Sequence, residues 1–251
     1  MENLSCSLTD FYEKAFGLGE YSNMGNFYSS IKFVEDIGCN YFTSGMTPEP
    51  FVLRMIYCLV SALTHIKEKL NIIHRDIKPS NILIDHKRAE KGFMVFKLCD
   101  FGISGELSNS IADTNVGCEK YMPPEKIQGQ PYSVKSDVWS LALTIIESAT
   151  GQHPYKNWLQ LNMISRCNLI IDEKSPELHP SYSEELRNLV DQCLEKDPEK
   201  RPDYQELKNM AIFQKYSDDA YLKSGLDSVD FPQFDLELFI NAVLERTGID
   251  G

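Results

Sequence analysis

Apolar residues recur at helical spacing along residues 47–70, which read TPEPFVLRMIYCLVSALTHIKEKL. The positions that share one face of such a helix are Val52, Met55, Ile56, Leu59, Leu63 and Ile66. Thr47 is suited to cap the helix, Pro48 fits its first turn, and the charge of Glu49 complements the helix dipole. Because a one-sided apolar face is typical of a helix packed on a core, we predict a core helix over residues 47–70.

Two short stretches after this helix have the composition of β-strands. The stretches NILID (81–85) and MVFKLCDF (94–101) are rich in β-branched and aromatic residues. A polar turn at Lys91 and Gly92 lies between them. This arrangement predicts a pair of strands joined by a turn.

Three further stretches have helical patterns. Residues 136–151 (SDVWSLALTIIESATG) are apolar nearly all round, which predicts a buried helix closed by Gly151. Ser183 begins a second helix, which ends before Pro198. Residues 234–248 (FDLELFINAVLERTG) form an amphipathic third helix near the end of the chain. The predicted fold class is therefore mainly α with a short β-strand pair.

Residues 17–46 show no sustained hydrophobic period. Loops longer than ~12–15 residues are uncommon in compact domains, so we interpret this stretch as an insertion, either loop or disordered. The sequence contains no internal repeats and no low-complexity tracts.

The composition narrows the class of protein. The 251 residues, 42% of them hydrophobic, support one good core or two small ones. A net charge of −12 argues against nucleic-acid or membrane partners, because both require a basic surface. The seven cysteines are widely spaced and form no metal-binding or disulfide pattern. The opening residues are no secretory signal, and no uninterrupted apolar run approaches the ~20 residues of a membrane span. We therefore expect a cytoplasmic protein, with the nucleus as the alternative location.

Two motifs carry the residue types that phosphoryl transfer needs. Residues 74–81 read HRDIKPSN and residues 99–102 read CDFG, with a predicted strand after the first and before the second. This chemistry needs a carboxylate to accept the proton of the attacking hydroxyl, ligands for Mg²⁺, and positive charge near the transferred group. The order and context of the motifs resemble the catalytic loop and the metal-binding turn of protein kinases.

The resemblance to protein kinases implies a role for each motif residue. Asp76 would be the catalytic base, and Lys78 would contact the γ-phosphate of ATP. Asn81 and Asp100 would bind Mg²⁺ and, through it, ATP. Phe101 would pack behind Asp100. A lysine at position 78 resembles Ser/Thr and dual-specificity kinases rather than tyrosine kinases.

Downstream stretches extend the resemblance over most of the chain. YMPPEKI resembles the end of a kinase activation segment, and SDVWSLALTIIE resembles the central helix of the large kinase lobe. By this resemblance, Arg201 of DPEKRP pairs with Glu125 to hold the activation segment. Asp137 anchors the backbone of the catalytic loop. The resemblance gives His74 a structural role as well, like Glu125, Asp137 and Arg201.

The stretch LCDFGISGELSNSIADTNVGCEKYM resembles the activation segment of MAP kinase kinases, especially their stress-activated branch. In that family a Ser-x-Ala-x-Thr stretch carries two activating phosphorylation sites, which correspond here to Ser110 and Thr114. Each phosphate adds nearly two negative charges that Arg75 can pair with, which would order the activation segment over residues 100–125. Between Thr114 and the next GC, this chain is one residue shorter than the family. The substrate-facing loop is therefore expected to sit differently.

The opening stretch MENLSCSLTDFYEKAF resembles the hinge between the two kinase lobes and the first helix after it. Met1 would occupy the gatekeeper position, and the backbones of Glu2 and Leu4 would contact adenine. No Gly-rich phosphate loop, no V-A-I-K-like lysine and no glutamate partner for that lysine has a match in the sequence. We therefore expect the large lobe alone, beginning at the hinge, with little or no kinase activity of its own. We expect four parts. They are the hinge with the first helix (1–16), the insertion (17–46), the large kinase lobe (47–216) and the C-terminal tail (217–251).

Two functions stay open at this point. In the first, the protein is an enzyme that uses ATP and Mg²⁺ to phosphorylate Ser, Thr or Tyr of a MAP kinase. In the second, it is a non-catalytic module that docks kinase partners or competes for them. The helix at 234–246 loosely resembles the docking helix that stress-branch enzymes offer to an upstream MAP kinase kinase kinase. Its alternative role is a terminal helix that packs on the core.

Overall fold

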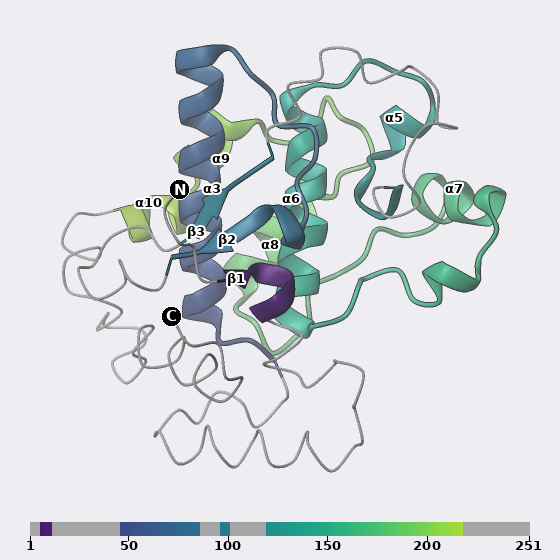
Figure 1. Cartoon of the computed structure of the whole chain (residues 1–251), viewed down its shortest axis with the longest axis horizontal. Helices are drawn as coiled ribbons and strands as arrows, with labels where there is room; N and C mark the ends of the chain where they lie inside the picture. Colours follow the sequence, from purple (N-terminus) through teal and green to yellow (C-terminus); the bar gives the residue numbers. More distant parts are fainter. Residues whose placement is uncertain (1–5, 12–45, 86–95, 101–118, 218–251) are drawn as a thin grey trace, which may run out of the picture.

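Two long helices form the frame of the molecule and lie side by side (Figure 1). Helix α3 spans Glu49–Leu70 and helix α6 spans Val134–Thr150. The structure is a computed structural model, and the residues that it describes are 6–11, 46–85, 96–100 and 119–217.

Helix α3 confirms the predicted core helix, but its first turn differs from the prediction. The N-cap is Pro48, without a side-chain cap, so the predicted capping role of Thr47 is wrong. The Thr47 hydroxyl instead donates to the carbonyl of Ser148 at 2.6 Å, and the Thr47 N–H donates to the carbonyl of Ala149 at 2.9 Å. Thr47 thereby joins the residues before α3 to the end of α6, which satisfies two backbone carbonyls in the last turn of α6.

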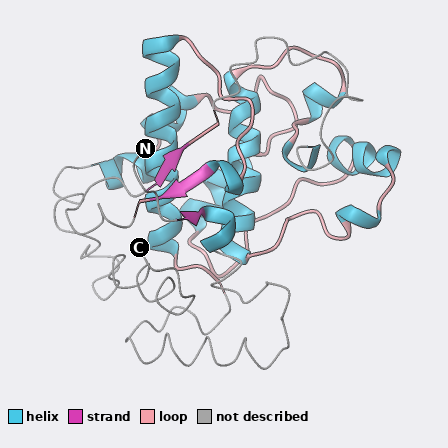
Figure 2. Ribbon diagram, in the orientation of Figure 1, coloured by secondary structure: helices cyan, strands magenta, loops and turns pink. Residues whose placement is uncertain are grey.

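Three short strands form one antiparallel sheet beside α3 (Figure 2). Strand β1 spans Cys6–Ser7, β2 spans Ile82–Ile84 and β3 spans Phe96–Leu98, in the order β1-β2-β3. Pairing of β2 with β3 confirms the predicted strand pair, and Leu83 lies opposite Lys97. Strand β1 adds a third strand that the pattern did not predict. The turn predicted at Lys91 and Gly92 lies outside the described residues.

Helix α6 has a clear signal at each of its ends. Ser133 caps it through a reciprocal pair of hydrogen bonds with Ser136, and Gly151 closes it in the left-handed conformation with φ of 67°. Glycine suits this position because a side chain is strained at positive φ. The buried helix predicted for residues 136–151 is therefore confirmed, with a start two residues earlier at Val134.

Shorter elements surround this frame (Figure 1). Further α-helices among the described residues are α5 (Pro124–Ile127), α7 (Met163–Ile171), α8 (Glu184–Cys193), α9 (Tyr204–Asn209) and α10 (Ala211–Ser217). The 3₁₀ turns are η2 (Pro79–Asn81), η4 (Glu119–Tyr121) and η5 (Trp158–Gln160). Ser183 caps α8 as predicted, by accepting from the N–H of Leu186.

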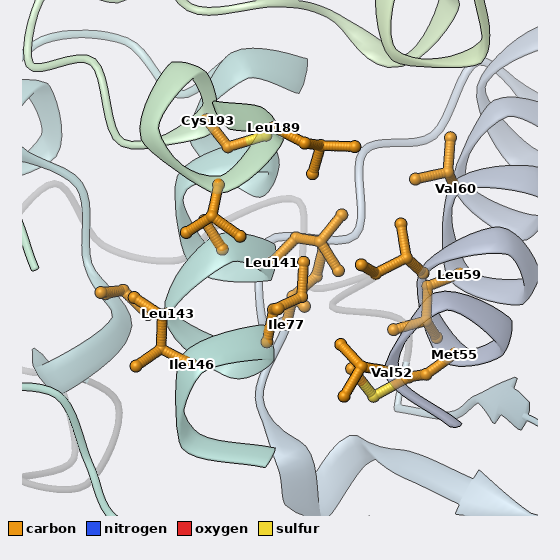
Figure 3. Close-up of a cluster of buried hydrophobic side chains, with 14 of the residues drawn as sticks. Val52, Met55, Leu59, Val60, Ile77, Leu141, Leu143, Ile146, Leu189 and Cys193 are labelled. Atoms are coloured by element: carbon orange, nitrogen blue, oxygen red, sulfur yellow. The ribbon is translucent and has the colours of Figure 1, made fainter. Parts of the chain in front are cut away.

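The core lies between α3 and α6, and Figure 3 shows side chains from both helices meeting there. Val52, Met55 and Leu59 of α3 face Leu141 of α6, and Ile77 lies between the helices. Each of these side chains is at most 1% exposed. The predicted fold class, mainly helical with short strands, is confirmed.

Helix α3 is long and apolar enough to cross a membrane by length and composition, although the sequence showed no uninterrupted apolar run of that length. In its most apolar window, 72% of the residues are buried inside the molecule. A core helix passes the same test, so α3 gives only weak evidence for a membrane span. No other helix in the described part of the chain passes it.

Two predicted segments lie largely or wholly outside the described residues. These are the insertion, of which only Met46 is described, and the helix at 234–246. The domain boundaries at 16, 46 and 216 stay predictions.

Candidate active site

The carboxylate of Asp76 is held by two side chains of its own loop. The Lys78 ammonium donates to Asp76 Oδ2 at 2.7 Å, and the Asn81 amide Nδ2 donates to the same oxygen at 2.8 Å. Asn81 Nδ2 also donates to the Asp76 carbonyl at 2.8 Å. The Asp76 side chain is 33% exposed and that of Lys78 is 21% exposed. A charged, oriented carboxylate thus remains accessible to a substrate.

His74 joins this loop to the residues before Asp100. Its Nε2 lies 3.1 Å from the Cys99 carbonyl, which can only accept, so Nε2 carries the proton. The Asp76 N–H donates to His74 Nδ1 at 3.4 Å. Burial lowers the pKa of the His74 imidazole, and the Asp137 charge opposes that shift. A neutral imidazole with a fixed tautomer is consistent with both bonds.

Asp137, in the first turn of α6, holds the backbone of the same loop. Its Oδ2 accepts from the His74 N–H at 2.9 Å and from the Tyr204 hydroxyl at 2.6 Å. Its Oδ1 accepts from the Arg75 N–H at 2.9 Å and from the Tyr132 hydroxyl at 2.7 Å. Arg75 adopts a positive φ of 69°, which costs energy for a residue with a side chain. The two backbone bonds to Asp137 stabilise this turn.

Four donors around one carboxylate fix its protonation state. Burial raises the pKa of Asp137, and the hydrogen bonds from Tyr204, Tyr132 and Arg75 oppose that rise. Because all partners donate, the arrangement requires an ionised carboxylate, which only accepts. Burial and the Asp137 charge raise the pKa of both tyrosine hydroxyls, so both stay protonated donors.

Asp100 lies two residues after β3, which pairs with β2, the strand that follows the catalytic loop. The Cys99 N–H donates to the Asn81 carbonyl at 2.9 Å, which brings the backbone before Asp100 next to Asn81. Asp100 is exposed and has a positive φ of 54°. Since Asn81 Nδ2 donates to Asp76, its remaining amide atom is the oxygen Oδ1, a ligand type that Mg²⁺ accepts.

This donor set fits Mg²⁺ bound together with a nucleotide. In the described part of the chain, no three His, Cys, Asp or Glu side chains gather into a metal-binding group. Mg²⁺ in kinase-type sites is bound by one or two protein oxygens together with substrate phosphates, so a full protein cage is not required. Asn81 and Asp100 are the residues suited to that arrangement.

The predicted pair of Arg201 and Glu125 forms in the interior. Arg201 Nη1 and Nη2 donate to the two carboxylate oxygens of Glu125 at 2.8 and 3.1 Å. The two side chains are 0% and 3% exposed. The Ser136 hydroxyl donates to Glu125 at 2.8 Å, and Arg201 also donates to the Lys135 carbonyl at 2.7 Å. The pair forms as the sequence predicted, and the bonds to Ser136 and Lys135 connect it to the start of α6.

Residues 119–121 are fixed to α6 by interactions that the sequence analysis did not identify. The Tyr121 hydroxyl donates to Glu147 at 2.5 Å, and the Ser140 hydroxyl donates to the Tyr121 carbonyl at 2.8 Å. The Lys120 ammonium lies 3.4 Å from Glu147. Asp137, Ser140 and Glu147 fall on one face of α6, because three- and seven-residue steps return to the same side of a helix. One helix face thus positions both the catalytic loop and the end of the activation segment.

Several predicted site residues lie outside the described part of the chain. They are Met1, Glu2, Leu4, Phe101, Ser110 and Thr114. Their roles stay predictions.

A cavity of about 580 Å³ lies away from the catalytic loop, at the C-terminal end of α6. Its lining includes Ile146, His153, Leu178 and Arg187, and none of the predicted site residues.

The sequence pattern of the "Protein kinase domain" family matches residues 16–213. The chain belongs to this family. The match includes the catalytic loop, Asp100, Asp137 and the Glu125–Arg201 pair. The arrangement described above is therefore that of a protein kinase domain.

Similar proteins include several MAP kinase kinases. The chain is 36% identical over 251 residues to dual specificity mitogen-activated protein kinase kinase sek-1 of Caenorhabditis elegans, covering 98% of this chain and 61% of that protein. It is 38% identical over 218 residues to protein kinase wis1 of Schizosaccharomyces pombe, covering 83% of this chain and 34% of that protein. It is 41% identical over 181 residues to human dual specificity mitogen-activated protein kinase kinase 7, covering 68% of this chain and 41% of that protein. The chain thus spans less than two thirds of the length of these relatives.

Proposed function

We propose that the chain is a dual-specificity protein kinase of the MAP kinase kinase type, which transfers the γ-phosphate of ATP to Ser, Thr or Tyr of a MAP kinase. The observation that carries the proposal is the Asp76 carboxylate, accessible to substrate and held by Lys78 and Asn81. The names of its relatives and the resemblance of its activation segment to the stress-activated branch support the substrate class.

In this proposal, each polar residue of the catalytic loop has a separate role in phosphoryl transfer. Asp76 orients the attacking hydroxyl and accepts its proton, while the ammonium of Lys78 places positive charge beside the γ-phosphate. Asn81 and Asp100 are the residues that would hold Mg²⁺, which supplies the charge that neutralises the phosphates. Asp137 keeps the loop backbone in place during these events, through the N–H groups of His74 and Arg75.

Regulation belongs to the same proposal. An upstream MAP kinase kinase kinase, docked through residues 234–246, would phosphorylate Ser110 and Thr114 in the cytoplasm or the nucleus. The Arg75 side chain is exposed while its backbone is fixed by Asp137, which suits a guanidinium that pairs with an incoming phosphate.

A phosphorylation assay with the full chain, Mg·ATP and an unphosphorylated MAP kinase tests the proposal. Asp76→Asn should lower the rate by about 10²–10⁴-fold, because it removes the proton acceptor. Glu185→Gln, which changes an exposed carboxylate on α8, is the matched control and should retain the rate. Absence of activity in the unaltered, folded chain would contradict the enzyme and favour a non-catalytic module that docks kinase partners.

A further inference from the structure

Glu119 begins the described end of the activation segment and forms an ion pair with helix α7. Its Oε2 lies 3.2 Å from Arg166 Nη1, and the two side chains are 12% and 13% exposed. Water is largely excluded from such a pair, so the charged hydrogen bond is stronger than one between surface groups. The pair joins two elements that are 47 residues apart in the sequence.

Arg166 is itself held in one orientation by η5. Its Nε donates to the Trp158 carbonyl at 3.1 Å, and its guanidinium carbon lies 5.2 Å from the centre of the Trp158 ring. The Trp158 side chain is 5% exposed. A guanidinium fixed on two sides loses little further freedom when it binds Glu119, so the ion pair is preorganised.

Helix α7 is tied down mainly at its two ends. Ile170 is its only buried residue and Leu169 packs half-buried against the core, so the apolar contact of the helix is small. The Lys196 ammonium donates to the carbonyls of Ile170 and Ile171 at the C-terminal end. Arg166 connects the N-terminal half to Glu119 and Trp158. The position of α7 and the position of Glu119 are therefore set together.

The other bonds of residues 119–121 relate this segment to the catalytic loop. Tyr121 is bonded to Ser140 and Glu147, on the face of α6 whose Asp137 holds the loop. From Asp137 to Glu147 the helix rises by about 15 Å at 1.5 Å per residue. Helix α6 thus positions Tyr121 from one side, and Arg166 positions Glu119 from another.

We propose that Arg166 is a positioning residue for the polypeptide substrate, acting through Glu119 on the end of the activation segment. This inference rests on the proposed kinase function, in which the segment over residues 100–125 faces the substrate and guides its hydroxyl toward Asp76. The substrate class is a polypeptide that runs along residues 119–121. ATP, which is bound at the catalytic loop, does not depend on this ion pair.

A double-mutant cycle in the full chain tests the inference. The variants are Arg166→Met, which keeps an apolar stem over Trp158, Glu119→Gln, and the two combined. Lys174→Met removes the cation of an exposed pair with Glu177 and is the matched control. The first readout is hydrogen–deuterium exchange of residues 119–122, where the Met122 N–H donates to the Glu119 carbonyl at 3.0 Å. The second is KM for a MAP kinase substrate against KM for ATP.

Each single variant should speed exchange at residues 119–122 by about tenfold, the effect of losing one charge-assisted hydrogen bond. KM for the polypeptide should rise by about five- to tenfold with KM for ATP unchanged. The double variant should match either single one, because the two residues act through each other. Lys174→Met should change neither readout.

Three outcomes would overturn the inference. Unchanged exchange at residues 119–122 in Arg166→Met shows that the ion pair does not fix the segment, whether or not the chain is active. Faster exchange with an unchanged polypeptide KM shows a structural role only. Additive effects of the two substitutions show that they act separately. An inactive unaltered chain instead contradicts the kinase proposal and the substrate part of this inference, while the exchange measurement still decides the role of the ion pair.

Discussion

At the scale of single residues, the Glu125–Arg201 pair shows how burial changes the effect of a charge on folding stability. Both carboxylate oxygens are bonded to the guanidinium, and neither side chain is more than 3% exposed. Two charges removed from water gain little net stability from each other, but one charge left alone in the interior is costly.

Arg201→Ala should therefore lower the free energy of unfolding by about 3–5 kcal/mol, as found when one partner of a buried pair is removed. The combined change Glu125→Gln and Arg201→Met should cost less than Arg201→Ala alone, because no uncompensated charge remains. Urea unfolding followed by circular dichroism measures both. Equal losses in the single and combined variants would show that lost packing, rather than the orphaned charge, is responsible.

His153 gives the fold a defined dependence on pH. Burial lowers the pKa of its imidazole from 6.5 to about 4, and Glu147 opposes the shift. Between these two values the unfolded chain binds a proton that the folded chain does not. Stability is therefore complete above pH 6.5 and is lost as pH falls toward 4.

His153→Gln should flatten this part of the pH–stability curve. The full effect of a depression of this size is about 3 kcal/mol, at ~1.4 kcal/mol for each pH unit. Unfolding free energies at pH 7 and pH 4.5, compared between the two chains, measure the difference. The same pH dependence in both chains would assign the acid sensitivity to other groups, among them His74, whose pKa burial also lowers.

The residues of the site differ in how far the sequence reveals them. Asp76, Lys78, Asn81 and Asp100 stand in two short motifs, so local order was enough to predict them. Tyr132, Tyr204 and Glu147 were missed, because their hydrogen bonds join residues that only the fold brings together. Tyr204 and Asp137, for example, are 67 residues apart.

At the scale of elements, the helical spacing of its apolar residues explains why α3 could be predicted, although its N-terminal half is buried nearly all round. Its inward face has a clear period, whereas its end is exposed at Leu70, of which 62% is accessible. Leu63 is 0% exposed on the same helix. Substituting each leucine in turn therefore distinguishes the stability that comes from core packing from the stability that comes from helix propensity.

Leu63→Ala should cost about 2–5 kcal/mol, since it removes buried methyl groups and leaves a cavity. Leu70→Ala makes the same chemical change at an exposed position and should stay within about 0.5 kcal/mol. Chemical denaturation of both variants measures the contrast. Similar losses at the two positions would contradict the assignment of Leu63 to the core.

Other elements had weaker signals in the sequence. Helix α6 was predicted because its residues are apolar nearly all round and Gly151 ends it. Helix α7 was not predicted, since Ile170 alone is buried and polar contacts at its ends hold it in place. The capping role of Thr47 was predicted wrongly, because its hydroxyl bonds the distant Ser148 carbonyl instead. Long-range polar contacts of this kind leave no periodic pattern.

At the scale of the whole molecule, α3 and α6 enclose the core while one face of α6 arranges the catalytic loop and the segment at 119–121. Motif order predicted a protein kinase domain, and the family match confirms it. The chain covers 61% of the length of the relative sek-1, so the activity and partners of the whole protein are proposals.

The central claim is that the catalytic loop and Asp100 form a site for Mg·ATP. The most direct measurement is the melting temperature of the purified 251-residue chain during titration with Mg·ATP. At 100 times the dissociation constant, a ligand specific for the folded state adds about 2.7 kcal/mol of stability. We predict a clear rise in melting temperature that Asp100→Asn abolishes and Glu185→Gln retains. No shift at millimolar Mg·ATP, or the same shift in Asp100→Asn, would contradict the claim.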